Sequence, residues 1–540
     1  MGISLSSGRK GGISLPDRLT FDRKLFLRTA LYTLLFQWCA HGYRYFNTDF
    51  SHDSTNLVLR FDAAFQITLG RFLVPVHGLF RGDLVMPFLC GLFGSLFLIP
   101  AVYLILRELH IRSHAGIIAA CALLAVNETM TATHVSYIAC VDAYMIGLLF
   151  AALGVRLLHM RRFSLPLSIL CIALSIGAYQ SYLQFAVMLA MLSVLRRLLD
   201  GETAAPAFAA GVKSVAALVL GLILYAVMLS VIHKLTGLTT SSGYNGLSGV
   251  GEYDGVSIPA LVADTWLMPL RIFLNPVTHK PRLALLIHLS LAALFAVGMV
   301  VQLRRLRPAC AALALLLLAA MPFGANCVNV ISKGMTHSLM TLSYQLFFLL
   351  FIMVFDRCAL QADVFSGKLM VKAAAAARKI AYCGMFVLVF LSAVYANQSY
   401  LKRSLEYKTQ DALFTRLFDR IEQVEGYEPG KTPVAFAGFF SGDSSMNMSR
   451  PGFAHLSQLY CGDNNFPATY WMTYGFVFDF ISNYPLNIIS DRDTAVLKMR
   501  EDVIHMPSFP EPGCCRMVDG VLVAKLSPYR VPTQEDLDRY

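Results

Sequence analysis

A cluster of charged and imidazole side chains follows the first long apolar segment of the chain. It comprises three residues between positions 47 and 56 and two arginines further along: Asp49, His52, Asp53, Arg71 and Arg81. If the apolar segment crosses a membrane, these groups lie at the edge of the bilayer, where charged residues are usually paired or used. A carboxylate there can accept a proton from a hydroxyl group, and a guanidinium can hold a phosphate through two hydrogen bonds.

Such chemistry requires a general base and a phosphate ligand. Asp53 has the side chain for the first role and Arg71 for the second. The alternative is structural: Asp53 caps an amphipathic helix, and the Arg71 side chain extends to the polar side of the interface. Arg81 also has a structural alternative, because Asp83 is near enough in sequence to pair with it. No cofactor is evident, since no Cys/His pattern has metal-ligand spacing. The loop carboxylates could hold a divalent cation, but nothing in the pattern indicates one.

Polar residues within or beside later apolar segments add further candidates. A carboxylate inside an apolar segment is a functional candidate by default, so Asp142 is either a substrate ligand or a buried hydrogen-bond partner. Tyr179 and Gln180 lie at a tight turn, which they either cap or use to bind substrate. Lys333 and His337 lie at a membrane edge, where they could meet a phosphate. The candidate substrate-binding residues are therefore His52, Arg71, Arg81, Asp142, Tyr179, Gln180, Lys333 and His337.

The composition places these residues in a membrane protein. The chain has 540 residues, of which 56% are hydrophobic and only 15% are charged, whereas soluble proteins have about 25% charged residues. A water-soluble core could not bury this much apolar surface, so a bilayer must be the solvent. The formal net charge of +11 then reflects basic cytoplasmic loops, so nucleic-acid binding is not expected.

The apolar segments predict about eleven transmembrane helices, since a span needs about 17–25 mainly apolar residues. They lie near 25–42, 84–106, 114–127, 136–158, 164–178, 181–195, 212–233, 283–303, 309–323, 338–355 and 379–396. Lys and Arg gather in alternate loops, which orients the chain with those loops in the cytoplasm. Residues 1–24 are then cytoplasmic, and 25–396 form the membrane domain. Residues 397–540 form an extracytoplasmic domain, which is periplasmic if the membrane is the bacterial inner membrane.

Two outer loops of the membrane domain are long, at 43–83 and 234–282. In the first, apolar residues at steps of three or four predict an amphipathic helix over 61–76. In the second, the Gly- and Ser-rich stretch 239–251 indicates either a simple linker or a lid that orders over substrate.

The polar C-terminal region predicts a small α/β domain. A helix is expected over 400–424, a strand over 433–438, a helix over 494–500 and a hairpin over 518–526 around Asp519-Gly520.

An ordered set of short motifs resembles the GtrII-type glucosyltransferase family, which is related to O-antigen serotype-conversion enzymes and has GT-C-like architecture. The motifs span roughly 40–530: Ser51-His-Asp-Ser54, Leu69-Gly-Arg-Phe72, Met86-Pro-Phe88, Ser136-Tyr137, Asp142-Ala-Tyr144, Gly177-Ala-Tyr-Gln180, Met335-Thr-His-Ser-Leu-Met340, Ala396-Asn397, Tyr400, Tyr407-Lys-Thr-Gln-Asp411 and Ile421-Glu422. Each motif is weak alone, but their order and placement make the match specific.

The resemblance implies a polyprenyl-phosphate-linked sugar donor, usually carrying glucose, and an extracytoplasmic glycan acceptor such as O-antigen. It also implies that an acidic residue of the first outer loop is the catalytic base. The matching position is Asp53, with Asp49 as the second choice. The family often has Trp where this chain has Phe72, which keeps an aromatic ring but leaves the identity of the sugar open.

Two other classes of membrane protein remain as alternatives. A lipid-sugar flippase or transporter tends to have inverted repeats and helices broken near mid-membrane, and the sequence has no convincing internal repeat. A polysaccharide polymerase or ligase also has many spans and outer loops, but it consumes a diphosphate-linked glycan.

Overall fold

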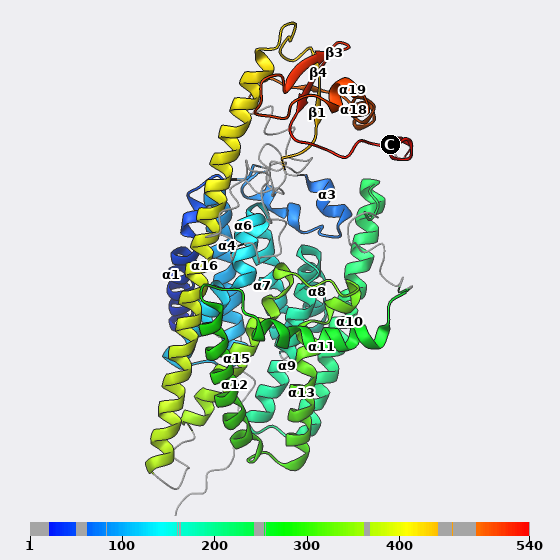
Figure 1. Cartoon of the computed structure of the whole chain (residues 1–540). Helices are drawn as coiled ribbons and strands as arrows, with labels where there is room; N and C mark the ends of the chain where they lie inside the picture. The colour runs from blue at the N-terminus through cyan, green and yellow to red at the C-terminus, as the bar shows by residue number, and fades with distance from the viewer. Residues whose placement is uncertain are drawn as a thin grey trace, which may run out of the picture.

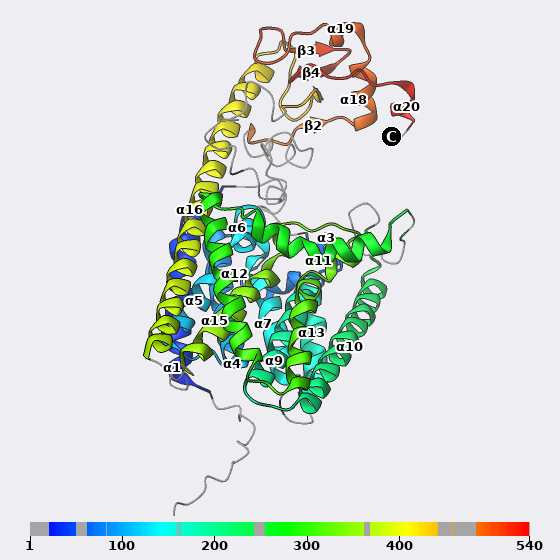
Figure 2. The ribbon, with the colours of Figure 1, turned by 60° about the horizontal axis from the view of Figure 1, so that its bottom comes forward.

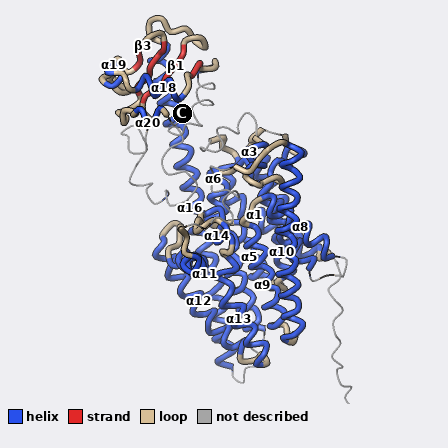
Figure 3. The backbone as a smooth tube through the Cα atoms, turned by 90° about the vertical axis from the view of Figure 1, so that its right-hand side faces the viewer, coloured by secondary structure: helices blue, strands red, loops and turns tan. Residues whose placement is uncertain are grey.

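The computed structural model describes a helical bundle that carries a small sheet-containing domain (Figure 1). The described residues are 21–49, 62–82, 84–158, 160, 164–241, 253, 255–360, 368–440, 456 and 482–538. Strands occur, among these residues, only in the C-terminal domain, which Figure 3 shows at one end of the bundle. We call that end of the bundle, where α1, α8 and α10 finish, the domain end. The opposite end, where α1 and α16 begin, is the basic end.

The bundle is built from helices that run between these two ends. They are α1 (Arg23–Tyr45), α4 (Pro87–Glu108), α5 (His114–Ala125), α6 (Glu128–Ser136), α7 (Val141–Leu158), α8 (Ser164–Ala178), α9 (Tyr182–Leu199), α10 (Ala204–Thr236), α12 (Pro281–Leu303), α13 (Pro308–Ala325), α15 (Gln345–Leu360) and α16 (Lys368–Glu422). Their buried faces form one large apolar core.

Among the described residues, nine helical segments are long and apolar enough to cross a membrane, which makes this a membrane protein. The sequence predicted about eleven spans. The two predicted spans that are not among these nine correspond to α1 and α8. In α1, the buried residues include Gln37, His41 and Arg44, so its composition is too polar for a typical span. In α8, the apolar helix has only 15 residues.

A helix in the second long loop was not predicted. α11 (Ile258–Leu274) lies across the ends of neighbouring helices, as Figure 2 shows. Trp266 and Leu270 on one side are exposed, while Leu261 and Thr265 are buried against the bundle. Such a two-sided helix suits the membrane interface. The Gly- and Ser-rich segment expected as a linker or lid lies mostly outside the described residues, at 242–252.

The prediction of one amphipathic helix over 61–76 is wrong. α3 covers only Ala63–Thr68, and a short 3₁₀ helix, η1, covers Val74–Leu79. Between them, Gly70 has a φ of +75°, a left-handed conformation that glycine adopts readily and that ends a helix. The apolar spacing of the segment thus reflects packing onto the bundle, not one helix.

α16 is a single continuous helix of 55 residues, where the sequence predicted a span at 379–396 and a separate helix at 400–424. At 1.5 Å per residue it is about 80 Å long, far more than the roughly 30 Å of a hydrocarbon core. Its first part packs into the bundle core, with Met385 and Tyr395 buried. Its last part supplies Phe414 and Leu417 to the core of the C-terminal domain.

The C-terminal domain has a four-stranded sheet of order β2-β1-β4-β3. Its strands are β1 (Pro433–Ala437), β2 (Asn487–Ile488), β3 (Cys515–Val518) and β4 (Val521–Lys525), and its short helices are α18 (Asp491–Lys498), α19 (Glu501–Ile504) and α20 (Gln534–Leu537). β1 is parallel to β2 and β4, while β3 and β4 form an antiparallel hairpin. The predicted strand, helix and hairpin are confirmed. The turn residues Asp519 and Gly520 both have positive φ, as the tightest hairpins require.

The continuity of α16 can be measured with spin labels on two exposed positions, Phe390 and Arg416. Cysteine variants at both sites should give one narrow distance near 40 Å, because 26 residues of straight helix rise about 39 Å. The distance is measured by double electron–electron resonance on purified protein whose exposed native cysteines have been replaced. A broad distribution, or a mean distance below about 30 Å, would show that the helix breaks between the two cores.

Candidate functional site

The loop that contains Arg71 is fixed to the turn between α8 and α9. The Leu73 backbone N–H donates to the Gly177 carbonyl at 2.9 Å. The Phe72 ring lies so close to Gly177 that a Cβ there would be 2.4 Å from the ring. Two motifs far apart in sequence, Leu69–Phe72 and Gly177–Gln180, are therefore packed together, and only glycine at 177 permits the approach.

Two side chains lock the backbone just before Arg71. The Gln180 amide donates to the Leu69 carbonyl at 2.8 Å, and the Tyr225 hydroxyl donates to the Gly70 carbonyl at 3.0 Å. The Tyr225 ring also stacks on Phe72, with ring centroids 5.8 Å apart. Gln180 thus holds the loop in place, and this contact is separate from its predicted role as a substrate ligand, which stays a prediction.

Arg71 lies on an aromatic surface at the domain end. Its guanidinium carbon is 5.0 Å from the centroid of the Tyr179 ring, and Nη1 donates to the Tyr144 hydroxyl at 3.3 Å. The Tyr144 and Tyr179 rings are themselves stacked, with centroids 5.0 Å apart. A planar cation on an aromatic face keeps its N–H groups at the edge, where they can meet an anion.

His337, in the loop after α14 (Val328–Ile331), lies within electrostatic range of this cation. Burial, followed by the positive charge of Arg71, lowers the pKa of His337 to about 4. The imidazole is therefore neutral near pH 7 and can donate one hydrogen bond without adding charge. Lys333 is exposed in the same loop and has a φ of 54°. The structure thus brings together Arg71, Tyr179 and His337 from three of the predicted positions.

Arg81 and Asp142 form a second cluster, which is a buried ion pair. Arg81 Nε lies 2.5 Å from Asp142 Oδ2, and both side chains are fully buried. Arg81 also donates to the carbonyls of Leu84 at 2.7 Å and Ala139 at 2.6 Å. Asp142 is thus a buried hydrogen-bond partner, and its predicted role as a substrate ligand stays a prediction. The expected partner Asp83 lies outside the described residues.

The first-loop carboxylates are only partly described. Asp49 is buried at 8% exposure just after α1 and interacts electrostatically with Arg44. Arg44 donates to the carbonyls of His134 and Asn47, at 3.0 and 2.8 Å. His52 and Asp53 are the other candidates of this loop. They lie within residues 50–61, outside the described residues.

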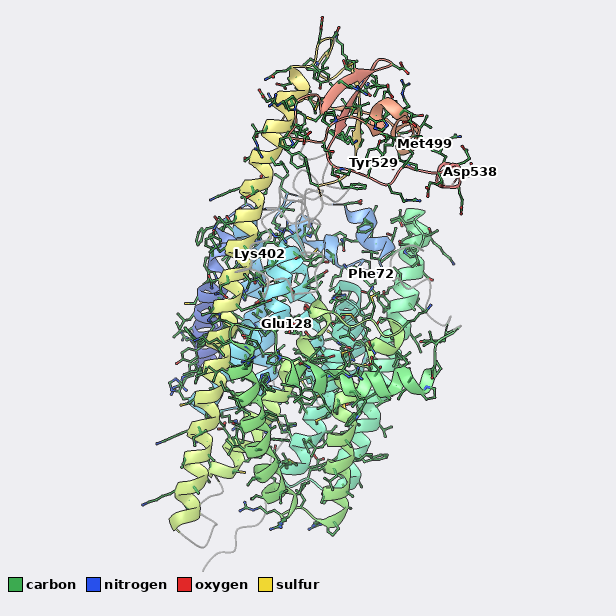
Figure 4. All side chains as sticks on the ribbon, in the orientation of Figure 1. Phe72, Glu128, Lys402, Met499, Tyr529 and Asp538 are labelled. Atoms are coloured by element: carbon green, nitrogen blue, oxygen red, sulfur yellow. The ribbon has the colours of Figure 1, made fainter. Side chains whose placement is uncertain are left out.

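Sequence reasoning missed Glu128, the first residue of α6. Its carboxylate accepts a 2.7 Å hydrogen bond from Ser338, the neighbour of His337. No described cation forms an ion pair with it, and it borders a pocket with a free volume of about 80 Å³ that is also lined by Thr278, His288 and Tyr344. Figure 4 shows Glu128 and Phe72 in the part of the bundle nearer the C-terminal domain. An acid that follows the apolar run of α5 was the available signal.

The loop 332–343 connects these two polar regions. Thr341 bonds Thr129 on α6 at 2.8 Å, and Gln184 on α9 donates to the Met340 carbonyl. Thr336 donates to Asn329 at 2.7 Å. The loop is therefore anchored on several helices, so the positions of His337 and Ser338 are fixed by packing. Within the described part of the chain, no three His, Cys, Asp or Glu residues come together as a metal site.

Comparison with known proteins gives one family match. A family model described as glucosyl transferase GtrII matches residues 42–355, which is more than half of the chain. The matched range holds the Arg71, Arg81–Asp142 and Glu128 clusters. No curated protein and no solved structure matches the chain.

The buried pair can be tested through stability. Asp142→Asn leaves the Arg81 charge buried without its counter-ion, which typically costs about 3–5 kcal/mol. We expect a clearly lower unfolding temperature in detergent. Replacing both partners, as in Arg81→Met with Asp142→Leu, should recover part of that loss because no charge then remains buried. A wild-type unfolding temperature for Asp142→Asn would mean that the pair does not hold the loop.

Proposed function

The chain belongs to the GtrII glucosyltransferase family, and on that premise we propose that it moves a hexose from a polyprenyl-phosphate carrier to an extracytoplasmic polysaccharide. Glucose is the proposed hexose and O-antigen the proposed kind of acceptor. The observation that carries the proposal is the Arg71 guanidinium, which lies on the Tyr179 ring where the helices end, within electrostatic range of the neutral His337. A lipid-linked phosphate lies at that level of a membrane.

The proposed step is a direct exchange at the anomeric carbon of the donor sugar. The acceptor oxygen forms a bond to this carbon as the bond to the phosphate oxygen breaks, and the lipid phosphate leaves with the electron pair. A carboxylate takes the proton of the acceptor hydroxyl. We propose Asp53 for this role, with Asp49 as the second choice; for Asp53 the proposal rests on residue type and family resemblance.

Arg71 would stabilise the negative charge that grows on the leaving phosphate. A charge-assisted, two-pronged hydrogen bond suits that task, and His337 can donate to another phosphate oxygen. Lys333, exposed in the same loop, would attract the anionic donor. The packing of Phe72 against Gly177 supports this role because it fixes Arg71 before substrate arrives, and pre-positioned donors need no reorganisation during the reaction.

We propose that the domain end is extracytoplasmic and that the chain lies in a bacterial inner membrane. The support is the concentration of arginines at the basic end, since cytoplasmic loops carry the excess of Lys and Arg. α16 would then carry the C-terminal domain into the periplasm, on the side of the glycan acceptor.

The orientation predicts the outcome of reporter fusions. Alkaline phosphatase, which is active only outside the cytoplasm, should be active when it is fused after Asn397. Fusion after Leu303, at the basic end, should leave it inactive. Activity at the second site and not at the first would reverse the proposed orientation.

Replacing Arg71 by Lys tests the phosphate-binding role. Lys keeps the charge but loses the planar grip. A lost charge-assisted hydrogen bond is worth about 1.5–3 kcal/mol, so the KM for donor should rise about 10-fold or more. The assay follows radiolabelled hexose from polyprenyl phosphate to cell polysaccharide in membranes. Arg282→Lys, at an exposed site at the domain end, is the matched control, and equal behaviour of the two variants would contradict the role.

Asp53→Asn tests the proposed base. Asn cannot accept the proton, and general-base catalysis is worth about 100- to 10,000-fold, so transfer should fall by that order while expression stays normal. If Asp53 only caps a helix, the variant should be nearly silent, because Asn is as good a cap as Asp. A near-silent result would move the proposed role to Asp49 or Glu128. Shortened polysaccharide chains in a deletion strain would instead indicate a polymerase.

A further inference from the structure

The basic end of the bundle contains a pocket that hexose transfer at the domain end does not use. It lies between the start of α1, the end of α4 and the start of α5, and its volume is about 480 Å³. Figure 2 shows these helix ends on the side of the bundle away from the C-terminal domain. Nothing in the proposed transfer accounts for a cavity of this size here.

The lining of this pocket combines basic and apolar side chains. The basic lining residues are Lys24, Arg28, Arg107, His110 and Arg112, and the apolar ones are Phe21, Leu25, Leu106, Ile111 and Ile117. The lining has one acidic residue, Asp22. Its carboxylate already accepts a hydrogen bond from the Leu25 backbone N–H at 3.0 Å, as the cap of α1.

Other arginines at the same end are matched by carboxylates. Arg156 lies 3.1 Å from Glu108, whose side chain is 1% exposed. Arg357 lies 2.6 Å from Asp200. At these positions the chain supplies its own counter-ions, as membrane-embedded charges generally require.

The pocket differs, because three of its cations have no such partner. Lys24, Arg28 and Arg112 make no ion pair and no side-chain hydrogen bond with any described residue. Residues 1–20 carry three basic residues and one acidic residue, so that segment adds no net negative charge. An anion from outside the chain would complete the site.

The outer face of α1 indicates which anion. Lys24, Arg28, Leu31 and Leu35 are spaced by four, three and four residues, which places them along one face of the helix. Leu31 is 60% exposed and Leu35 is 52% exposed. Leu35 lies about 10 Å along the helix from Arg28. A basic end followed by exposed leucines matches a charged headgroup followed by acyl chains.

We propose that this pocket binds the phosphate headgroup of an anionic membrane phospholipid, whose chains lie along Leu31 and Leu35. Basic pockets between transmembrane helices commonly hold such headgroups on the cytoplasmic side. The proposal concerns a lipid that stays bound and does not depend on the transferred sugar. It therefore stands or falls separately from the proposed function.

The test is phosphatidylglycerol binding to the full-length protein, purified in detergent and measured by native mass spectrometry. Wild-type protein should retain phosphatidylglycerol in preference to phosphatidylcholine. Arg28→Gln with Arg112→Gln should weaken that binding about 30-fold, at about five-fold for each basic residue. Arg304→Gln with Arg307→Gln removes two exposed charges from the same end and should leave binding unchanged. Arg28→Lys with Arg112→Lys keeps both charges and should bind nearly normally, because attraction of the headgroup to this open site depends on charge.

Three results would overturn the proposal. Equal losses in the two double variants would mean that the lipid responds only to overall surface charge. Equal retention of phosphatidylcholine would show that the headgroup charge is not recognised. Full displacement of phosphatidylglycerol by millimolar inorganic phosphate would identify a site for the free anion, without a role for Leu31 and Leu35.

Discussion

The contact between Phe72 and Gly177 is the constraint on which the geometry of the domain end depends. The segment 62–82 has only two short helices, α3 and η1, so its position depends on what it contacts. A Cβ at 177 would overlap the Phe72 ring, and the Leu73–Gly177 hydrogen bond forms only at that close approach. The Gln180 and Tyr225 contacts then fix the backbone on either side of Gly70. Arg71 takes its place on Tyr179 as a consequence.

The two ends of the bundle satisfy buried charge in different ways. At the domain end, Arg81 and Asp142 neutralise each other within the protein, and their hydrogen bonds tie the loop to the start of α7. At the basic end, some arginines have internal carboxylate partners, while Arg28 and Arg112 of the pocket between α1, α4 and α5 form no ion pair with a described residue. In a low-dielectric surrounding an unmatched cation is costly, and it is tolerated where water or a ligand headgroup can reach it.

α16 joins two cores that would otherwise be connected by a loop. Because the same helix packs in the bundle through Met385 and Tyr395 and in the C-terminal domain through Phe414 and Leu417, the orientation of the domain follows that of the helix. A rigid link of this kind limits where the C-terminal domain can lie relative to Arg71. The C-terminal domain is thus positioned by helix geometry.

The sequence by itself determined that a lipid bilayer surrounds the helical domain, and it determined the order of the elements. Hydropathy and length predicted the helical membrane domain, because burial in lipid leaves a strong local signal. Apolar spacing and turn residues predicted the small α/β domain that follows it. The Asp519–Gly520 hairpin was equally local, since its turn needs positive φ at two adjacent residues. The motifs also carried the family, which the match over residues 42–355 bears out.

Only the tertiary structure decided which polar residues meet. Arg81 pairs with Asp142, because the fold brings the start of α7 to the end of the loop. Glu128 accepts a hydrogen bond from Ser338, a residue far away in the chain that lies next to His337. The break at Gly70 and the continuity of α16 were likewise decided by packing. Local spacing records which residues are apolar, but two packed surfaces determine where a helix stops and which charges pair.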